Sequence, residues 1–162
     1  MFHVGEYLVY KRDVCKVEEI KEKYMKEMDY YVLTPIEDPT LTISIPFTNS
    51  QIRPLISKER VEEIIASIPS IEVINSEDRM IESEYRNLLN SEDHKDLIRI
   101  IKTTYLRNKE RLENNKKIGE TDHHYFEKAE KYLYDEFSIV LSLSFEEVKQ
   151  YVVDKVVELE KI

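Results

Sequence analysis

Five basic side chains in the second half of the chain have the spacing of one face of a helix. At about 100° per residue they fall within roughly 100° of one another; they are Lys95, Arg99, Lys102, Lys109 and Lys116. The segment 95–117 holds eight basic and three acidic residues, although the whole chain has a net charge of −9. Because flexible cationic side chains bind phosphates without reading base sequence, the row predicts either a non-specific nucleic-acid contact or a solvated helix face. Arg79 and Arg86, seven residues apart on an expected helix, extend the row.

Histidine, cysteine and carboxylate side chains offer a second kind of chemistry. His123 and Glu127 stand four apart on one expected helix, and His94 lies near the start of another. A metal site needs three or four converging ligands, and Cys15 is the sole cysteine, so we interpret His123 as part of a solvated helix start. Cys15 lies in an apolar run typical of a strand, where a small packed side chain is the simpler interpretation.

Composition narrows the possible functions further. Two glycines among 162 residues exclude glycine-rich phosphate loops, and the sequence contains no recognised catalytic motif. We therefore expect no catalytic residue, cofactor or metal site, with a small enzyme built on His123, Glu127 or Cys15 as the least favoured alternative. No apolar stretch approaches the ~20 residues of a membrane span, and the single cysteine fits a reducing compartment, so we expect a cytoplasmic protein.

The elements that must position these residues differ between the two parts of the chain. Short β-branched and aromatic runs dominate residues 6–55 and predict four to five antiparallel strands; the clearest runs are 6–10, 14–20, 30–36 and 41–46. After Pro54 the apolar period changes from 2 to 3.6, which predicts five helices. The expected starts of the helices are Ser57, Ser76, Ser91, Thr121 and Ser144. The fold class is therefore α+β, with a β module over 1–55 and a helical bundle over 56–162.

The third expected helix carries both the basic row and an apolar stripe. The stripe consists of Ile98, Ile101, Tyr105 and Leu112, and its spacing predicts that these four side chains face the core of the helical domain.

The order of these features resembles the CarD/CdnL-type bacterial transcription regulators. The resemblance is carried by VGEYLVY, YYVLTPI, LTISIPF and IRPLISKERVEEII, followed by the helices. It implies a Tudor-like β module that binds the β subunit of RNA polymerase, like the interaction domain shared with the transcription-repair coupling factor. It also implies a helical domain that contacts promoter DNA and thereby modulates open-complex formation.

The resemblance also implies which residues meet the polymerase. The basic family positions in the second and fourth strands fall on Lys23 and Ser44, so one charge is kept and one is absent. The stretch LTISIP is the best candidate for an exposed sheet edge, since Pro46 ends it. The expected polymerase-binding residues are Lys23, Ile43, Ser44, Ile45 and Pro46. The glycine-containing turn that follows the first strand in the family is replaced here by KRDVCK.

In the helical domain the family places a tryptophan wedge, two basic residues and a tyrosine. These positions are Ile81, Ser83, Glu84 and Tyr85 here, so an isoleucine replaces the wedge and both basic residues are lost. Arg86, Lys102 and Arg107 match basic positions of the family. The expected DNA-binding residues are Arg79, Ile81, Arg86, Lys95, Arg99, Lys102, Arg107 and Lys109.

Two functions are compatible with this pattern. The first is a transcription regulator that binds the RNA polymerase β subunit and contacts promoter DNA weakly and without sequence specificity. The alternative is a protein-only adaptor that binds polymerase or another partner and never contacts DNA, which the loss of the wedge and of the basic pair favours. The sequence predicts neither the direction of regulation, nor the promoters, nor the oligomeric state.

Overall fold

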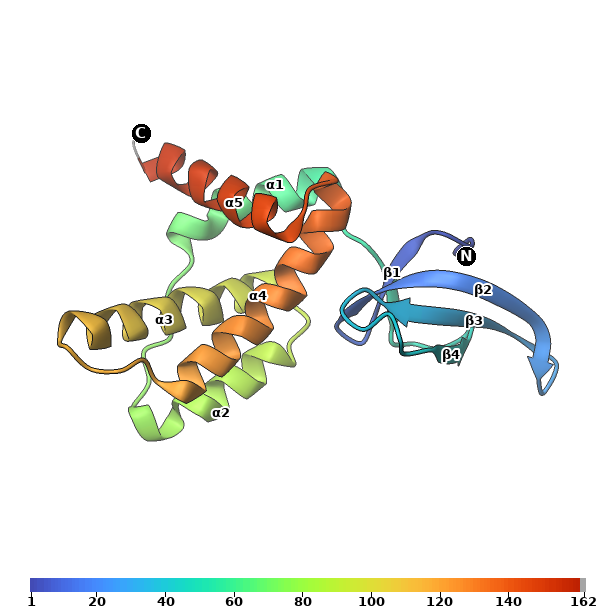
Figure 1. The fold of residues 1–162 in the computed structure, drawn as a ribbon, viewed down its shortest axis with the longest axis horizontal. Helices are drawn as coiled ribbons and strands as arrows, with labels where there is room; N and C mark the ends of the chain where they lie inside the picture. The colour runs from blue at the N-terminus through green and yellow to red at the C-terminus, as the bar shows by residue number, and fades with distance from the viewer. Residues whose placement is uncertain (161–162) are drawn as a thin grey trace. The chain divides into compact units, whose positions relative to one another are not determined.

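The chain forms two compact units, Met1–Ser57 and Lys58–Ile162, which we call the sheet unit and the helical unit (Figure 1). The computed structural model describes residues 1–160, with the side chains described up to residue 156. Residues 161 and 162, the last two of the expected helical domain, lie outside the described residues. An antiparallel sheet followed by five helices confirms the predicted α+β class.

The sheet unit is a five-stranded antiparallel sheet with the strand order β4-β3-β2-β1-β5. β1 and β2 form one hairpin, β2 and β3 form a longer one, and β4 and β5 are the two edges. The strands are β1 (Tyr7–Tyr10), β2 (Asp13–Met25), β3 (Met28–Pro35), β4 (Ile43–Pro46) and β5 (Ile52–Pro54).

One face of this sheet carries its apolar core. The buried members are Leu8, Cys15, Val17, Tyr31, Leu33 and Ile45. Tyr31 stacks on Phe47 with ring centroids 4.0 Å apart, and its hydroxyl accepts a hydrogen bond from the backbone N–H of Phe2. Core residues from β1, β2, β3 and β4 therefore fix the register of the strands, because a slip of one residue would turn them to the opposite face.

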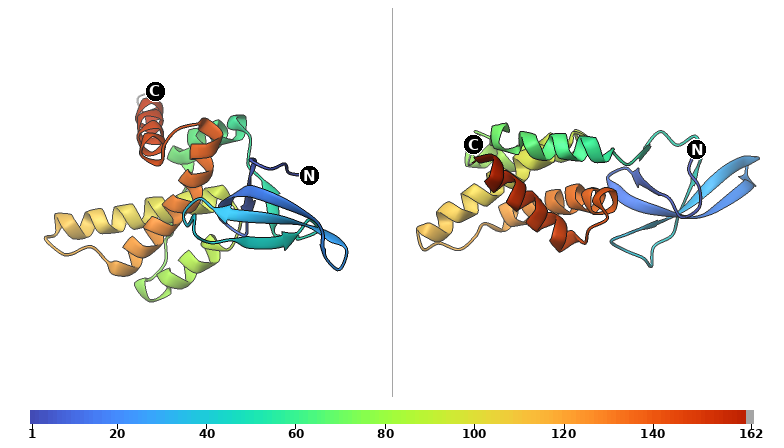
Figure 2. Two further views of the ribbon diagram at one scale, coloured as in Figure 1. Left: turned by 45° about the vertical axis from the view of Figure 1, so that its right-hand side comes forward. Right: turned by 90° about the horizontal axis from the view of Figure 1, so that it is seen from above.

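The β2–β3 hairpin is longer than the apolar runs predict, and its tip extends beyond the other strands (Figure 2). Its two-residue turn consists of Lys26 and Glu27, with φ angles of 51° and 58°. Lys11, in the turn after β1, has a φ of 59°. Non-glycine residues thus adopt left-handed conformations at both hairpin turns, which costs about 1 kcal/mol at each residue.

The helical unit contains five α-helices and a short 3-10 turn, η1 (Ile68–Ser70). α3 and α4 are antiparallel and pack along each other, while α2 packs on both and α5 packs on α1 and α4 (Figures 1 and 2). Among the residues that the structure describes, no helix combines the length and apolar character needed to cross a bilayer. The helices are α1 (Lys58–Ser67), α2 (Asp78–Leu89), α3 (His94–Glu113), α4 (Glu120–Leu141) and α5 (Phe145–Glu160).

Three of the expected helix starts are displaced by one or two residues. α2, α3 and α4 are preceded by Glu77, Asp93 and Gly119 rather than by Ser76, Ser91 and Thr121 as N-caps. At α3 the Asp93 carboxylate accepts a hydrogen bond from the N–H of Lys95 at 2.9 Å, which satisfies a free donor of the first turn.

Ser144, the expected start of the fifth helix, caps α5. The Ser144 hydroxyl accepts a hydrogen bond from the N–H of Glu147 at 3.1 Å, and the Glu147 carboxylate accepts one from the N–H of Ser144 at 3.0 Å. These two hydrogen bonds form a capping box. The backbone N–H of Ser144, followed by its hydroxyl group, favours the ionised carboxylate and lowers the pKa of Glu147.

Candidate functional site

The outer edge of β4 has unpaired backbone groups. Ile45 is paired with Tyr31, and the N–H of Phe47 donates to the Asp29 carbonyl at 3.0 Å. Because hydrogen-bonded and non-bonded pairs alternate along antiparallel strands, the N–H and C=O groups of Thr42 and Ser44 point away from β3. No further strand pairs with β4 among the described residues. This edge can therefore accept an additional strand.

Four predicted polymerase-binding residues form β4 itself, and their side chains differ in exposure. Ser44 is exposed, Ile43 and Pro46 are partly buried, and Ile45 is 4% exposed within the sheet core. Ile45 thus anchors the strand rather than contacting a partner through its side chain. Pro46 has no N–H, so donors on the outer edge end at Ser44.

Lys23, the fifth predicted residue, lies in the irregular outer part of β2. Its φ is 46°, its side chain is exposed, and its N–H donates to the Asp29 carboxylate at 3.0 Å. The carbonyl of the same Asp29 accepts the hydrogen bond from Phe47, directly after β4. Asp29 therefore links Lys23 to the end of β4.

Three of the predicted DNA-binding residues form hydrogen bonds within the helical unit. Lys102 Nζ donates to the carbonyls of Ile68 and Ile71 at 2.9 and 2.6 Å, and Arg99 Nε donates to the Glu72 carbonyl at 3.2 Å. The Ile68 carbonyl also accepts a hydrogen bond from the N–H of Ile71 at 3.2 Å, and the carbonyls of Ile71 and Glu72 follow η1, where the helical turn has ended. Arg99 and Lys102, two members of the predicted DNA-binding row, are thus partly exposed and held against the backbone of the helical unit. Arg107 likewise bonds to carboxylates of the helical unit.

The remaining predicted cations keep more freedom. Arg79 is exposed and pairs with Glu77 at 2.7 Å, an interaction that solvent weakens. Arg86 and Lys109 are exposed and Lys95 is half-buried, and within the described residues none of these three forms an ion pair. The basic row that the sequence predicts is therefore not one continuous surface of unpaired cations.

Ile81 does not occupy the position of a DNA wedge. It is 5% exposed and lies with Tyr85 and Leu89 on the buried face of α2, where residues four apart share one side of the helix. A wedge needs an exposed apolar side chain that enters a groove. The prediction that Ile81 contacts DNA is therefore wrong, because core packing of the helical unit uses its side chain.

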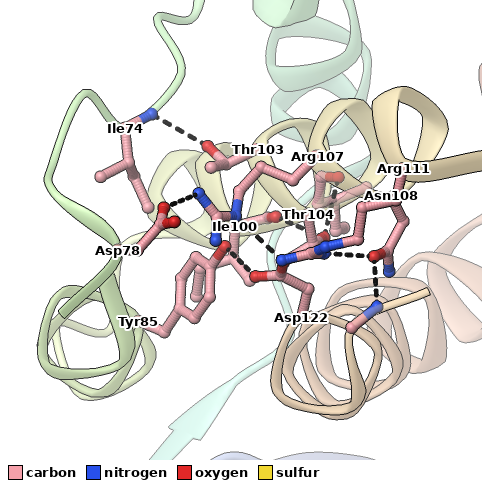
Figure 3. Close-up of polar contacts among 12 residues, drawn as sticks. Ile74, Asp78, Tyr85, Ile100, Thr103, Thr104, Arg107, Asn108, Arg111 and Asp122 are labelled. Carbon is pink, nitrogen blue, oxygen red and sulfur yellow. Dashed lines mark hydrogen bonds and ion pairs between the residues drawn. The ribbon is translucent and has the colours of Figure 1, made fainter. Parts of the chain in front are cut away.

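Tyr85 belongs to a buried polar network around Asp122 (Figure 3). The Asp122 carboxylate, 2% exposed, accepts hydrogen bonds from the Tyr85 hydroxyl at 2.6 Å and from Arg107 Nε at 2.9 Å. Arg111 donates to the same carboxylate, and Arg107 also donates to Asp78 at 2.9 Å. The network joins α2, α3 and α4 through one buried charge.

The pKa shifts in this network follow from its hydrogen bonds. Burial alone would raise the pKa of Asp122, but hydrogen bonds from Tyr85, Arg111 and Arg107 outweigh it and lower the pKa. Burial, followed by the hydrogen bond to Asp122, raises the pKa of Tyr85. Asp122 is thus ionised and Tyr85 protonated at neutral pH, an arrangement that stabilises the helix packing.

The residues considered for catalysis have other partners. Cys15 is fully buried, and burial, together with the nearby Asp13 carboxylate, raises its pKa to about 12, so the thiol stays protonated. His123 pairs with Glu127 at 2.9 Å, and His94 contacts Glu136 at 2.8 Å. Across the described part of the chain, no three potential ligands are grouped as a metal ion would require.

An apolar groove between α3 and the start of α4 was not expected from the sequence. Tyr105 and Leu112 were predicted to face the core but are 57% and 60% exposed. They line a cavity of about 270 Å³, which we call the α3–α4 groove. Thr103 and Thr104, which precede Tyr105, are 3% and 0% exposed, so the covered face of α3 differs from the face that carries Tyr105. The lining residues are Thr104, Tyr105, Asn108, Lys109, Leu112, Ile118, His123 and Phe126.

The edge of β4 and the α3–α4 groove are thus two exposed features of the described residues, one with unpaired backbone groups and one with apolar side chains. No protein-family model matches the chain, and no curated protein is significantly similar to it.

Proposed function

We propose that the chain is a transcription regulator that binds the β subunit of RNA polymerase through the outer edge of β4. The observation that carries this proposal is the pair of unpaired backbone positions at Thr42 and Ser44. The resemblance to the CarD/CdnL-type regulators supplies the partner. A strand of the polymerase would extend the sheet by pairing with β4, so main-chain hydrogen bonds would supply the affinity.

The sheet unit is well suited to such pairing. Ile45 fixes β4 in the core, so the edge is preorganised before the partner arrives. The Lys23 side chain is exposed and its backbone is linked through Asp29 to the end of β4, so its positive charge would suit an acidic group of the partner.

Promoter contact by the helical unit would depend on Arg86, Lys95 and Lys109. Among the described residues, these predicted cations form neither an ion pair nor a side-chain hydrogen bond, and they lie on two helices. Binding to phosphates through three separate charges is weak and falls with salt. Affinity for a promoter complex would then come mainly from the polymerase.

The second candidate function is an adaptor that binds polymerase without contacting DNA. The burial of Ile81 and the hydrogen bonds of Arg99 and Lys102 favour it, because they remove the wedge and part of the basic row. The two candidates share the edge of β4 and differ only in the helical unit.

One substitution tests the shared claim. Ser44→Pro removes the outward N–H but keeps the pairing with β3, because that N–H makes no bond to β3. We expect binding to core RNA polymerase to weaken at least about tenfold. The variant loses one main-chain hydrogen bond and leaves the carbonyl of the partner strand buried without a donor. Ser44→Ala, which keeps the backbone donor, is the matched control and should bind normally. Equal binding by the proline variant would refute pairing through this edge.

A charge reversal separates the two candidates. If the helical unit contacts DNA, the triple variant R86E/K95E/K109E should weaken promoter binding by the polymerase complex. The loss of affinity should be larger at low salt than at high salt. The adaptor function predicts unchanged promoter binding and unchanged salt dependence.

A further inference from the structure

The α3–α4 groove exposes more apolar surface than folding of the helical unit requires. Tyr105, Leu112 and Ile118 are 57%, 60% and 41% exposed, yet they meet at one cavity with Phe126. Exposed apolar side chains that gather at one place mark binding surfaces more often than isolated ones do.

The size and openness of the groove favour a protein partner. Its volume of about 270 Å³ is below the range of roughly 300–1,000 Å³ that is typical of small-molecule sites. A small molecule in that volume would leave much of Leu112 in water. A helix laid along the groove could cover Tyr105, Leu112 and Ile118 together, as in helix-in-groove recognition.

The charges at the groove indicate the chemistry of the partner. Among the described residues that line it, Lys109 is positive and none is acidic. Lys109 has no ion pair within the described residues. The His123 ring pairs with the Glu127 carboxylate, which does not line the groove. The charge of Lys109 complements a carboxylate beside an apolar helix face.

We propose that the α3–α4 groove binds an amphipathic helix of a partner protein that carries acidic side chains along its apolar face. This deepens the adaptor candidate by giving the helical unit its own class of partner. It does not depend on the edge of β4, so failure of polymerase binding would leave it standing.

The test uses the full chain and two synthetic peptides. The first is a helical peptide of about 15 residues with leucine and phenylalanine on one face and glutamates beside them. The second has every glutamate replaced by lysine. Fluorescence anisotropy of the labelled peptides gives the dissociation constants for the native chain and three variants.

The variants place one negative charge in or outside the groove. Leu112→Glu should weaken binding of the glutamate peptide at least about tenfold, since burial of a leucine supplies that much affinity. Lys109→Glu should weaken it about threefold to tenfold by repulsion at the rim. Leu106→Glu, at a residue of α3 that is 48% exposed and does not line the groove, should leave binding within about twofold. The replaced side chains are exposed, so all three variants should fold, which their circular dichroism checks.

Four results would overturn the proposal. The first is binding of the lysine peptide as tight as that of the glutamate peptide, and the second is an equal loss of binding for Leu106→Glu and Leu112→Glu. The glutamate peptide could fail to bind at about 1 mM, the weak limit of specific recognition. Sedimentation equilibrium could also show a dimer that Leu112→Glu dissociates, which would make a second copy of the chain the occupant.

Discussion

Replacement of Asp122 by asparagine should strongly destabilise the helical unit. Asparagine keeps the shape of the side chain but removes the charge and turns one acceptor into an N–H donor that faces a guanidinium group. Loss of one partner from a buried ion pair costs about 3–5 kcal/mol. The Arg107 and Arg111 side chains are 24% and 28% exposed, so water partly solvates the guanidinium groups left behind. We therefore expect a loss near the lower limit, about 3 kcal/mol.

Urea unfolding followed by helical ellipticity measures this loss, because the α-helices lie in the helical unit. Asp78→Asn is the matched control within the same network, since Asp78 also pairs with Arg107 but its side chain is 87% exposed. Its loss should be within about 1 kcal/mol, as for other exposed ion pairs.

The pH dependence gives a second, independent readout. The pKa of Asp122 is lowered from 3.8, so the stability contributed by its ionised form is complete above that value and is lost as the pH falls through the lowered pKa. The difference between the native chain and Asp122→Asn should therefore be constant from neutral pH to about 5 and shrink below about 4. A loss under about 1 kcal/mol at neutral pH, or equal losses for both variants, would refute the role given to this carboxylate.

Three further predictions concern single residues. Ile81→Ala should cost about 2–4 kcal/mol in urea unfolding, because a buried isoleucine leaves a cavity, whereas an exposed wedge would cost under about 0.5 kcal/mol. Cys15 should react with iodoacetamide far more slowly in the folded chain than in urea, because it is fully buried with a pKa of about 12; equal rates would contradict this burial. Glu27→Gly should raise the stability of the sheet unit by about 0.5–1 kcal/mol, because glycine tolerates the φ of 58°, and a loss of stability would show that this turn has another conformation.

Patterns within single elements predicted the fold class well. The alternation of LTISIP predicted a strand at a sheet edge, which is β4, and Ser144 was the expected start of α5, whose first turn it caps. Both depend on local geometry, in which the period of the backbone decides which side chains meet.

Properties that depend on neighbouring elements were harder to predict. The spacing of Lys102 on α3 correctly separates it from the core stripe, but the sequence does not show that the carbonyls of Ile68 and Ile71 lie within its reach. Ile81 was predicted to contact DNA because of its place in the family pattern. Its spacing from Tyr85 and Leu89 is instead that of a buried helix face.

The sequence also did not predict the α3–α4 groove. Tyr105 and Leu112 belong to the predicted apolar stripe, but the neighbouring Thr103 and Thr104 are buried instead, so the helices cover another face of α3. Periodicity alone does not tell which of two adjacent faces of a helix its neighbours cover.

Hydrogen exchange at single amides tests the central claim most directly. In the free chain the N–H groups of Thr42 and Ser44 point away from β3 and should exchange fast, whereas the N–H of Ile45 should exchange slowly. Addition of RNA polymerase should slow the exchange of Thr42 and Ser44 strongly and leave the amides of β5, at the other edge, unchanged. Fast exchange at Thr42 and Ser44 in the presence of saturating polymerase would contradict the proposed pairing.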